Sequence, residues 1–308
     1  MEIITGTKEF IIEHDTAVSI GKFDGVHIGH RRLLDEIIEK KKDGLKALVF
    51  TFDPYPEVLF GRSDGRLTTS EEKRLLLERM GIDILVEYPM DKETADTDPG
   101  IFLRDIVAGR LGASFVAAGP DLSFGAGGRG NIELLNEMSG GLGITVSEVE
   151  KVKCDVDGEE KTVSSTLIRS LIEKSDMGNA EKLLGMPYLI YGKVVHGNSL
   201  GRTLGFPTAN IPISDDKIIP GYGVYAADVR IAEIGYKALV NIGVKPTIEG
   251  SDPETPSAEC FIYDFDGDIY GEDIEVCLGN FIRPEMKFDS VDELKAQVIH
   301  DIQKAREN

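Results

Sequence analysis

Two histidines in a glycine-rich turn could handle phosphate. They lie in Gly21-Lys22-Phe23-Asp24-Gly25-Val26-His27-Ile28-Gly29-His30, between an apolar run and an amphipathic one. Glycines let the backbone approach a ligand, and a helix N-terminus offers unpaired N–H groups to an anion. His27 and His30 can donate to phosphate oxygens, and these hydrogen bonds strengthen as charge builds on the α-phosphate and the leaving pyrophosphate. Positioning and charge stabilisation then suffice without a covalent intermediate.

Other interpretations of this turn are weaker. It is neither a Walker loop nor a G-x-G-x-x-G fingerprint. A lone histidine near a helix start is more often a cap or a surface residue. Here two of the five histidines of the chain flank Ile28-Gly29 inside one turn, which favours a phosphate site.

A second candidate for phosphate binding is the segment Val163-Ser164-Ser165-Thr166-Leu167-Ile168-Arg169. Its three hydroxyl residues stand at the start of an expected helix. Arg169 follows one turn later, where its guanidinium can bind two phosphate oxygens at once. Taken alone, this pattern is more typical of an ordinary helix N-cap than of a phosphate site.

A third candidate lies in the second half of the chain. Gly192-Lys193-Val194-Val195-His196-Gly197 leads into Gly201-Arg202-Thr203-Leu204-Gly205-Phe206-Pro207-Thr208-Ala209-Asn210. Thr208 and Asn210 alternate, so in an extended segment both side chains point to one face. Hydroxyl and amide oxygens suit Mg²⁺, which takes its other ligands from waters and phosphates. The alternative is a loop with a proline turn and a polar strand face.

The first half alternates apolar runs with helical stretches, and this alternation predicts a doubly wound α/β sheet. Thr69 and Glu72 resemble a capping box at the start of one helix. Ligands of such sheets bind beyond the carboxyl ends of the strands. The expected strands are 18–20, 47–52, 82–88 and 115–118, and the expected helices are 31–42, 70–80, 99–110 and 131–138.

The pattern changes near Gly185-Met186-Pro187, so two domains are expected, 1–185 and 186–308, joined by a short linker. The second domain is predicted to be a small antiparallel β-barrel with a C-terminal helix over 291–306, because Leu294, Val298 and Ile302 share helical spacing. Its expected strands are 188–196, 223–231, 236–242, 259–263 and 274–278.

Composition limits the possible partners. With 54 acidic and 34 basic residues, the net charge of −20 disfavours nucleic acid and anionic lipid. The three cysteines, Cys154, Cys260 and Cys277, lack metal-ligand spacing and suit a reducing compartment. No apolar run approaches the roughly 20 residues of a membrane span. We therefore expect a cytoplasmic protein, monomeric or weakly homo-oligomeric, that binds neither nucleic acid nor membrane.

The motifs of the first half resemble a known family. H-x-G-H resembles the nucleotidyltransferases, and the longer string G-K-F-D-G-V-H-I-G-H resembles the adenylyltransferase domain of bacterial bifunctional riboflavin kinase/FAD synthetases. The segment S-S-T-x-x-R is similar to a second nucleotide contact of that family. The resemblance implies that His27 and His30 are catalytic. It also implies ATP contacts from Gly21, Lys22, Phe23, Asp24, His27, His30, Ser164, Ser165, Thr166 and Arg169.

Two further segments resemble the flavin side of that domain, namely Thr51-Phe52-Asp53-Pro54-Tyr55-Pro56 and Gly119-Pro120-Asp121-Leu122-Ser123-Phe124-Gly125 followed by Arg129. They imply flavin contacts from Asp53, Asp121, Phe124 and Arg129. The sequence departs from the family pattern at Tyr55, where a histidine is usual. It departs again at Pro120, Leu122 and Ser123, which replace more polar, aromatic and basic residues.

In the second half, G-R-x-L-G-F-P-T-A-N resembles the riboflavin kinase module. Asn241-Ile242-Gly243-Val244-Lys245-Pro246-Thr247 and the stretch from Ile282 to Ser290 continue the match. The resemblance implies that Thr208 and Asn210 bind metal and phosphate and that Glu259 is the catalytic base. Implied ATP or flavin contacts are Gly192, Lys193, His196, Gly197, Arg202, Gly205, Pro207, Thr208, Asn210 and Arg283.

The expected function is thus two ATP-dependent reactions supported by Mg²⁺. Residues 186–308 would phosphorylate riboflavin to FMN, and residues 1–185 would convert FMN and ATP to FAD and pyrophosphate. Two alternatives remain: only the kinase half is active, or the chain is a flavin-binding regulator without turnover.

Overall fold

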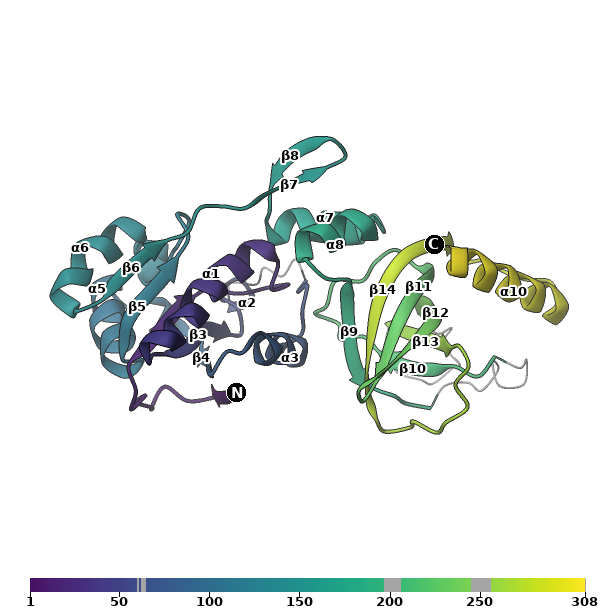
Figure 1. Cartoon of the computed structure of the whole chain (residues 1–308), viewed down its shortest axis with the longest axis horizontal. Coiled ribbons are helices and arrows are strands. Elements are labelled where there is room, and N and C mark those ends of the chain that lie inside the picture. The colour runs from purple at the N-terminus through teal and green to yellow at the C-terminus, as the bar shows by residue number, and fades with distance from the viewer. Residues whose placement is uncertain (60, 62–64, 197–205, 245–255, 308) are drawn as a thin grey trace. The chain divides into compact units, whose positions relative to one another are not determined.

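Six runs of the N-terminal half pair as parallel strands of one sheet (Figure 1). The computed structural model describes every residue except 60, 62–64, 197–205, 245–255 and 308. The sheet order is β1-β4-β3-β2-β5-β6. The strands are β1 (Glu2–Thr5), β2 (Thr16–Ile20), β3 (Lys46–Asp53), β4 (Ile84–Pro89), β5 (Ala113–Ala118) and β6 (Thr145–Glu148). Every residue of β2 is buried, as expected of a parallel sheet covered on both faces.

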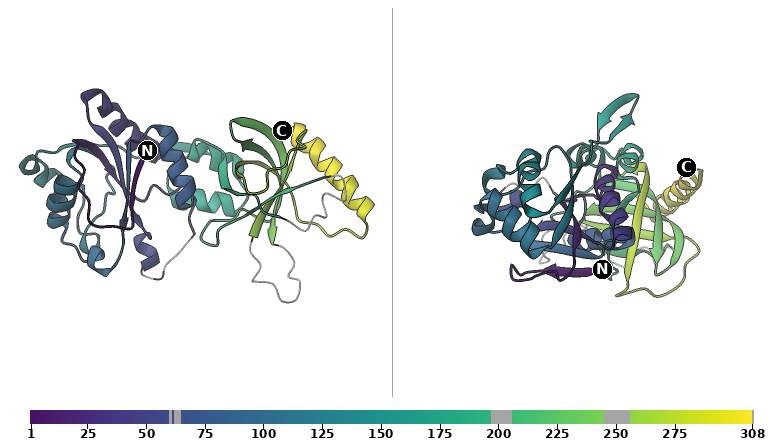
Figure 2. Two further views of the ribbon diagram at one scale, coloured as in Figure 1. Left: turned by 90° about the horizontal axis from the view of Figure 1, so that it is seen from below. Right: turned by 60° about the vertical axis from the view of Figure 1, so that its left-hand side comes forward.

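Helices lie on both faces of this sheet (Figure 2), which confirms the doubly wound prediction. The predicted helix over 70–80 has its expected bounds, whereas the helix over 99–110 continues from Phe102 as a π-helix. The helical elements are α1 (Ile28–Glu39), η1 (Lys40–Asp43), α2 (Pro56–Leu59), α3 (Ser70–Met80), α4 (Lys92–Ala95), α5 (Pro99–Ile101), η2 (Phe102–Arg110), η3 (Ala126–Gly128) and α6 (Ile132–Leu142).

The strand order reverses beside β2. The chain runs outward from β2 through β3 to β4 and then returns to β5 on the other side of β2. In doubly wound sheets, ligands bind beyond the carboxyl ends of the strands at such a switch point. The turn over 21–30 follows β2 and the loop over 119–129 follows β5, so the topology brings both predicted segments to this position.

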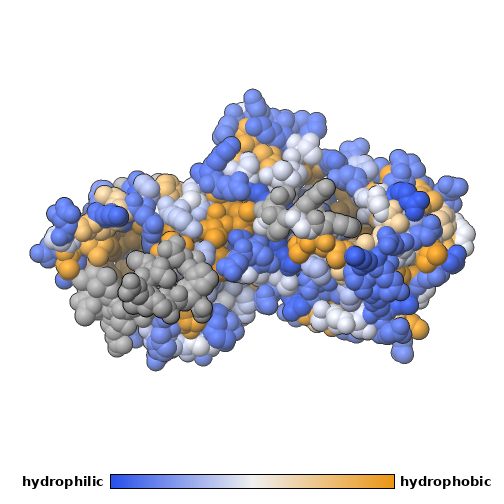
Figure 3. All heavy atoms as spheres, turned by 180° about the vertical axis from the view of Figure 1, so that it is seen from behind, coloured by the Kyte–Doolittle hydropathy of each residue, from blue (hydrophilic) through white to orange (hydrophobic). Residues whose placement is uncertain are grey.

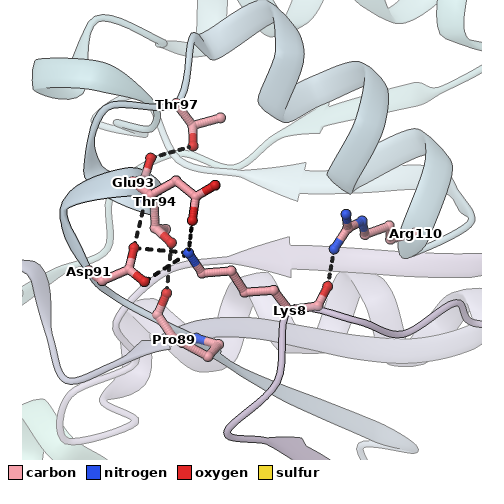
Figure 4. A network of polar contacts seen from close by, with 7 residues as sticks. All are labelled: Lys8, Pro89, Asp91, Glu93, Thr94, Thr97 and Arg110. Carbon is pink, nitrogen blue, oxygen red and sulfur yellow. Dashed lines mark hydrogen bonds and ion pairs between the residues drawn. The ribbon is translucent and has the colours of Figure 1, made fainter.

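A polar network fastens the segment before β2 to the region after β4 (Figure 4). The ammonium of Lys8 donates to Asp91 at 3.0 Å and to Glu93 at 2.8 Å. Asp91 also accepts the Thr94 N–H at 2.9 Å as the N-cap of α4, and Arg110 donates to the Lys8 carbonyl. The hydrogen bond from Lys8 lowers the pKa of Asp91 to about 2. The carboxylate of Asp91 therefore stays ionised near neutral pH.

Six antiparallel strands form the second sheet, in the order β10-β13-β12-β11-β14-β9. A bridge between Val195 and Asn210 joins its two edges, so the sheet is a nearly closed barrel, as predicted. The strands are β9 (Tyr188–Lys193), β10 (Ala209–Pro212), β11 (Gly223–Ile231), β12 (Ile234–Val244), β13 (Pro256–Ile262) and β14 (Asp273–Pro284).

Helix α10 (Val291–Glu307) packs on the barrel. Its residues Val298 and Ile302, two of the three predicted to share a face, contact a barrel cluster of Val224, Leu239, Tyr263 and Ile282. The remaining elements are a polar hairpin, β7 (Lys153–Val156) with β8 (Glu159–Thr162), and the helices α7 (Ser165–Glu173) and α8 (Met177–Leu184).

The chain divides into two units that interleave in sequence. The first unit comprises Met1–Asp64, Lys73–Asp155 and Glu159–Val163, and the second comprises Gly65–Glu72, Val156–Gly158 and Ser164–Asn308. A stretch of the N-terminal half, residues 65–72, therefore packs with the barrel. The functional boundary between residues 185 and 186 stays a prediction.

Hydrophilic residues cover most of the face in Figure 3, and hydrophobic residues form scattered patches there. Among the helices that the structure describes, none has the length and apolar character needed to cross a bilayer.

Candidate active sites

The turn after β2 places both histidines at the start of α1. His27 is the N-cap residue, and its Nδ1 accepts the backbone N–H of His30 at 3.2 Å. The turn needs left-handed backbone at Gly25, where φ is 83°. Because Nδ1 of His27 is an acceptor, its proton belongs on Nε2, which is then free to donate to a ligand.

The two imidazole rings stack on each other. Their centroids lie 3.6 Å apart with an interplanar angle of 12°. A Cβ at Gly29 would lie 3.2 Å from the His27 ring, so a side chain at this position would crowd the ring. Phe23, which is fully buried, packs against His30, and their ring centroids lie 5.2 Å apart. Phe23 thus supports the stack from the protein interior.

Burial keeps both imidazoles neutral. Desolvation lowers the pKa of His27 to about 4, opposed by a backbone hydrogen bond and by Asp121. Desolvation also lowers the pKa of His30 well below its usual value, and the neighbouring His27 and Lys73 lower it further. At pH 7 the rings therefore donate as neutral N–H groups, and the charge that assists their hydrogen bonds must come from the ligand.

Lys73 lies close to the histidine pair, and no pattern in the sequence indicated this position. It lies on α3, is 2% exposed, and donates to the Tyr55 hydroxyl at 3.3 Å. Its ammonium also lies 4.8 Å from the centre of the Tyr55 ring. Tyr55 follows β3, the parallel neighbour of β2. Tyr55 and Lys73 therefore lie near the carboxyl ends of these strands, where the turn over 21–30 also begins. Lys73 therefore adds positive charge beside His30.

The other predicted ATP contacts of this turn differ in burial. Phe23 is buried in the protein and Asp24 is 2% exposed, whereas the side chain of Lys22 is exposed. The Lys22 carbonyl accepts from the Thr51 hydroxyl at 3.3 Å. Gly21 packs against Phe23, whose ring would lie 3.3 Å from an added Cβ.

The predicted flavin contacts fall into exposed and buried groups. Asp53, Asp121 and Arg129 are exposed, and Asp121 pairs with Lys151 at 3.2 Å. Phe124, in contrast, is 3% exposed and belongs to the core of the sheet, where its ring centroid lies 5.5 Å from that of Phe102. The flavin contact of Phe124 stays a prediction.

The S-S-T-x-x-R segment forms the start of a helix, as predicted. Ser164 is the N-cap of α7 and accepts the Leu167 N–H at 3.3 Å. Arg169 donates from Nε to the Gly65 carbonyl at 3.0 Å. These residues belong to the second unit, whereas His27 and His30 belong to the first. A joint ATP site of the two segments stays a prediction.

In the barrel, three polar residues align across neighbouring strands. Asn210 on β10 pairs directly with Glu259 on β13, and Glu259 pairs with Asn241 on β12. Directly paired residues of antiparallel strands point to the same face, with Cβ atoms roughly 5 Å apart. Asn210, Glu259 and Asn241 therefore form one row, which we call the barrel row.

A cavity of ≈ 390 Å³ adjoins one end of this row. Pro207, Thr208 and Asn210 line one side of it, and the loop over 265–270 lines another. Asn210 is 3% exposed, and its Oδ1 is buried without a hydrogen-bond partner among the described residues. A buried acceptor without a donor needs another partner, and a hard cation would satisfy it.

The donor set fits a weakly held cation. Among the described residues, no three His, Cys, Asp or Glu side chains gather as a metal site. The oxygens of Thr208 and Asn210 could hold a divalent ion only together with waters or phosphates, which is how Mg²⁺ binds to nucleotides in proteins. Cys260 lines the same cavity, and burial raises the pKa of its thiol.

The remaining kinase-side predictions have varied surroundings. Lys193 is exposed and donates to the Gly271 carbonyl at 2.7 Å, and Gly192 precedes it in β9. The ring of His196 contacts that of Tyr270, a residue of the cavity loop, with centroids 3.8 Å apart and an interplanar angle of 30°. Arg283 donates to Asp301 of α10 at 2.8 Å. Gly197, Arg202 and Gly205 lie outside the described residues.

The sequence contained signals for two features that were not predicted as site residues. Asn241 stands inside the quoted N-I-G-V-K-P-T stretch, and only the strand register shows that it neighbours Glu259. The cavity loop reads Phe265-Asp266-Gly267-Asp268-Ile269-Tyr270, a turn-rich composition that indicates a loop but no chemistry.

Comparisons with known proteins match both halves of the chain. A family model described as FAD synthetase matches residues 10–167, and one described as riboflavin kinase matches residues 184–308. The Escherichia coli K12 protein named bifunctional riboflavin kinase/FMN adenylyltransferase is 37% identical over 294 residues, covering 94% of this chain and 91% of its own. The Bacillus subtilis 168 protein of the same name is 35% identical over 297 residues, with the same coverage.

A solved structure resembles the whole chain. It is described as a macrolide-efflux protein from Streptococcus pneumoniae, and it is 33% identical with a TM-score of 0.81. The match covers 99% of this chain and 98% of that one. The efflux description belongs to that protein, whereas the two enzymes above are named for flavin chemistry.

Proposed function

The chain belongs to the family of bifunctional riboflavin kinase/FMN adenylyltransferases, and we propose that the histidine pair and the barrel row perform its two reactions. The enzyme phosphorylates riboflavin to FMN and adenylylates FMN to FAD, both with ATP. We assign the kinase to residues 186–308 and the adenylyltransferase to residues 1–185. The observation that carries the kinase assignment is the direct pairing of Glu259 with Asn210. Asn210 lines the cavity, whereas Glu259 is not among its lining residues.

In the proposed kinase step, Glu259 is the general base. Its carboxylate accepts the proton of the ribityl hydroxyl while that oxygen attacks the γ-phosphorus of ATP. A new O–P bond forms, the bond to the β-phosphate oxygen breaks, and ADP leaves. Thr208 and Asn210 would hold a divalent cation, for which we propose Mg²⁺, and the bound ion would neutralise phosphate charge.

In the proposed adenylyltransferase step, a phosphate oxygen of FMN attacks the α-phosphorus of ATP. The bond from the α-phosphorus to the bridging oxygen breaks and pyrophosphate leaves. No general base is required, because the attacking phosphate of FMN is already ionised. His27 and His30 donate to the phosphate oxygens on which charge builds. Lys73 supplies a fixed positive charge nearby. Arg169 and the hydroxyls of residues 164–166 are proposed as further ATP contacts, and the exposed Asp53, Asp121 and Arg129 as flavin contacts.

The remaining kinase-side contacts and the partners are proposed as follows. Gly192, Lys193, His196, Pro207 and Arg283 would surround the nucleotide or the flavin. The substrates are ATP, riboflavin and FMN, and the net charge of −20 supports the absence of nucleic-acid binding. We propose a monomer or a weak homo-oligomer.

A chromatographic assay tests the proposal. The protein is incubated with riboflavin, saturating ATP and MgCl₂, and riboflavin, FMN and FAD are separated over time. We expect FMN to appear first and FAD to follow, and we expect excess EDTA to stop both. Accumulation of FMN without FAD would instead indicate that only the kinase half is active. Tight riboflavin binding without ATP consumption would indicate a regulator.

A further inference from the structure

A strap from the N-terminal half packs onto the barrel unit. We use the name strap for residues 65–72, which cluster with the barrel although they precede it by more than a hundred positions. Arg66 pairs with Lys217 in a parallel bridge. The Arg66 N–H donates to the Asp216 carbonyl at 2.6 Å, and the Ile218 N–H donates to the Arg66 carbonyl at 2.8 Å. The strap is therefore hydrogen-bonded to the barrel unit through its backbone.

A buried ion pair closes the end of the strap. The ammonium of Lys217 lies 2.6 Å from the Glu72 carboxylate, and their side chains are 1% and 0% exposed. Lys217 also donates to the Leu67 carbonyl at 2.9 Å and lies 4.4 Å from the centre of the Tyr188 ring. Breaking such a pair by removing one partner is strongly destabilising, because it leaves an uncompensated buried charge.

The second carboxylate oxygen of Glu72 reaches strand β9. Its Oε1 accepts the backbone N–H of Tyr191 at 3.0 Å, while Oε2 accepts the Thr69 N–H at 2.8 Å and the Lys217 ammonium. One buried side chain therefore caps a helix, neutralises a lysine and holds an edge strand of the barrel. None of these contacts is needed by the proposed chemistry itself.

Strand β9 leads directly to the barrel row. Four residues after Tyr191, the Val195 N–H donates to the Asn210 carbonyl at 2.8 Å and so joins the two edges of the barrel. The position of Asn210, a residue that lines the cavity, thus depends on the segment that follows β9. A displacement of about 1 Å at a reacting group can cost a hundredfold in rate.

We propose that Glu72 is a positioning residue for the riboflavin kinase site. Its carboxylate, held by Lys217, fixes β9 at Tyr191, and β9 in turn fixes Asn210 through Val195. The proposal rests on the proposed role of Asn210. It means that the kinase site depends on a residue outside the riboflavin kinase match, which begins at residue 184.

Two double variants distinguish the effect of the hydrogen bond between residue 72 and β9 from the effect of the buried charge. In E72Q/K217M the glutamine oxygen still accepts from Tyr191 and no charge remains. In E72L/K217M no charge remains either, but the acceptor is lost. We expect E72L/K217M to raise the kinase KM for ATP about tenfold over E72Q/K217M, at similar thermal midpoints measured by circular dichroism.

Two controls keep the test decisive. Adenylyltransferase activity on supplied FMN should be equal in both variants. D228L/K237M removes an exposed ion pair of 2.8 Å on the same barrel and should leave the KM for ATP unchanged. If the single variant E72Q folds, it should lower the thermal midpoint more than either double variant, because it leaves Lys217 charged and buried.

The outcomes distinguish the two proposals. Equal KM values for E72Q/K217M and E72L/K217M would overturn the positioning role of Glu72. If Asn210→Ala leaves the kinase kinetics unchanged, the proposed role of Asn210 itself is wrong.

Discussion

The two candidate sites, both of which we propose to bind ATP, offer different kinds of atoms to it. At the switch point, His27, His30 and Lys73 offer nitrogen donors, so this site can bind phosphate oxygens directly. In the barrel, Asn210 and Glu259 offer oxygen acceptors, which can approach phosphate oxygens through a bound cation. The difference suits the two reactions, because only the kinase acceptor is a hydroxyl that must lose a proton.

The two sites also differ in what fixes their side chains. The histidine stack is set locally, by an N-cap bond and by the contact of the His27 ring with Gly29. The barrel row is set by register, and a slip of one residue would turn Glu259 to the opposite face. We therefore expect the first site to be sensitive mainly to substitutions of its own residues. The second site should also be sensitive to substitutions of distant residues such as Glu72.

The largest expected effect is that of Glu259→Gln. If Glu259 is the base, its amide analogue should lower kcat of FMN formation by about 10²–10⁴-fold, the usual contribution of general base catalysis. FAD formation from supplied FMN should be unchanged. The measurement is the rate of each product by chromatography. A drop in both rates would contradict the assignment of the two reactions to two separate sites.

The reverse pattern is expected for His30→Ala. Loss of one preorganised donor to a transition state typically costs about 10²–10³-fold in kcat. FAD formation from FMN and ATP should fall by this amount, while FMN formation from riboflavin continues. Gly29→Ala should act in the same direction, because its Cβ would lie 3.2 Å from the His27 ring. Normal FAD synthesis by both variants would refute a catalytic histidine pair.

Protonation of His27 gives a smaller and purely thermodynamic effect. Its pKa is about 4 in the fold and 6.5 in the unfolded chain, so the unfolded state binds more protons between these values. The stabilisation is complete above pH 6.5 and is lost as the pH falls towards 4. At pH 5 the loss is about 2 kcal/mol for this group.

The matched variant is His27→Gln, which keeps an acceptor at the N-cap but does not titrate. Thermal midpoints should be compared at pH 7 and pH 5 by circular dichroism, since the chain contains no tryptophan. The wild-type midpoint should fall by more than that of the variant. Parallel decreases in both proteins would show that His27 is not a buried neutral imidazole.

Local features of the fold could be predicted from the sequence. The capping box of Thr69 and Glu72 is present, with N–H contacts of 2.8 and 3.2 Å in the two directions. The strands β1 and β7–β8 were not predicted, because they are only four residues long and largely polar or exposed. Such segments lack the apolar periodicity on which strand prediction depends.

Long-range features of the sites could not be predicted in the same way. The capping role of Glu72 is local, but its partner Lys217 is 145 residues away. The low pKa of His30 depends on its burial and on the nearby Lys73 of α3, and no spacing in the sequence reveals either. The motif Asn241-Ile242-Gly243 was visible, yet its proximity to Glu259 depends on the pairing of β12 with β13.

The smallest expected effect is that of removing Lys73, the third nitrogen donor beside the histidine pair. Lys73→Met removes a buried positive charge beside His30, and we expect the adenylyltransferase KM for ATP to rise about tenfold with kcat less affected. Lys153→Met, which removes an exposed lysine paired with Glu160 at 2.8 Å, is the matched control and should change neither constant. A rise in the KM for FMN alone would place Lys73 on the flavin side of the site, and no change in either KM would leave it a structural partner of Tyr55.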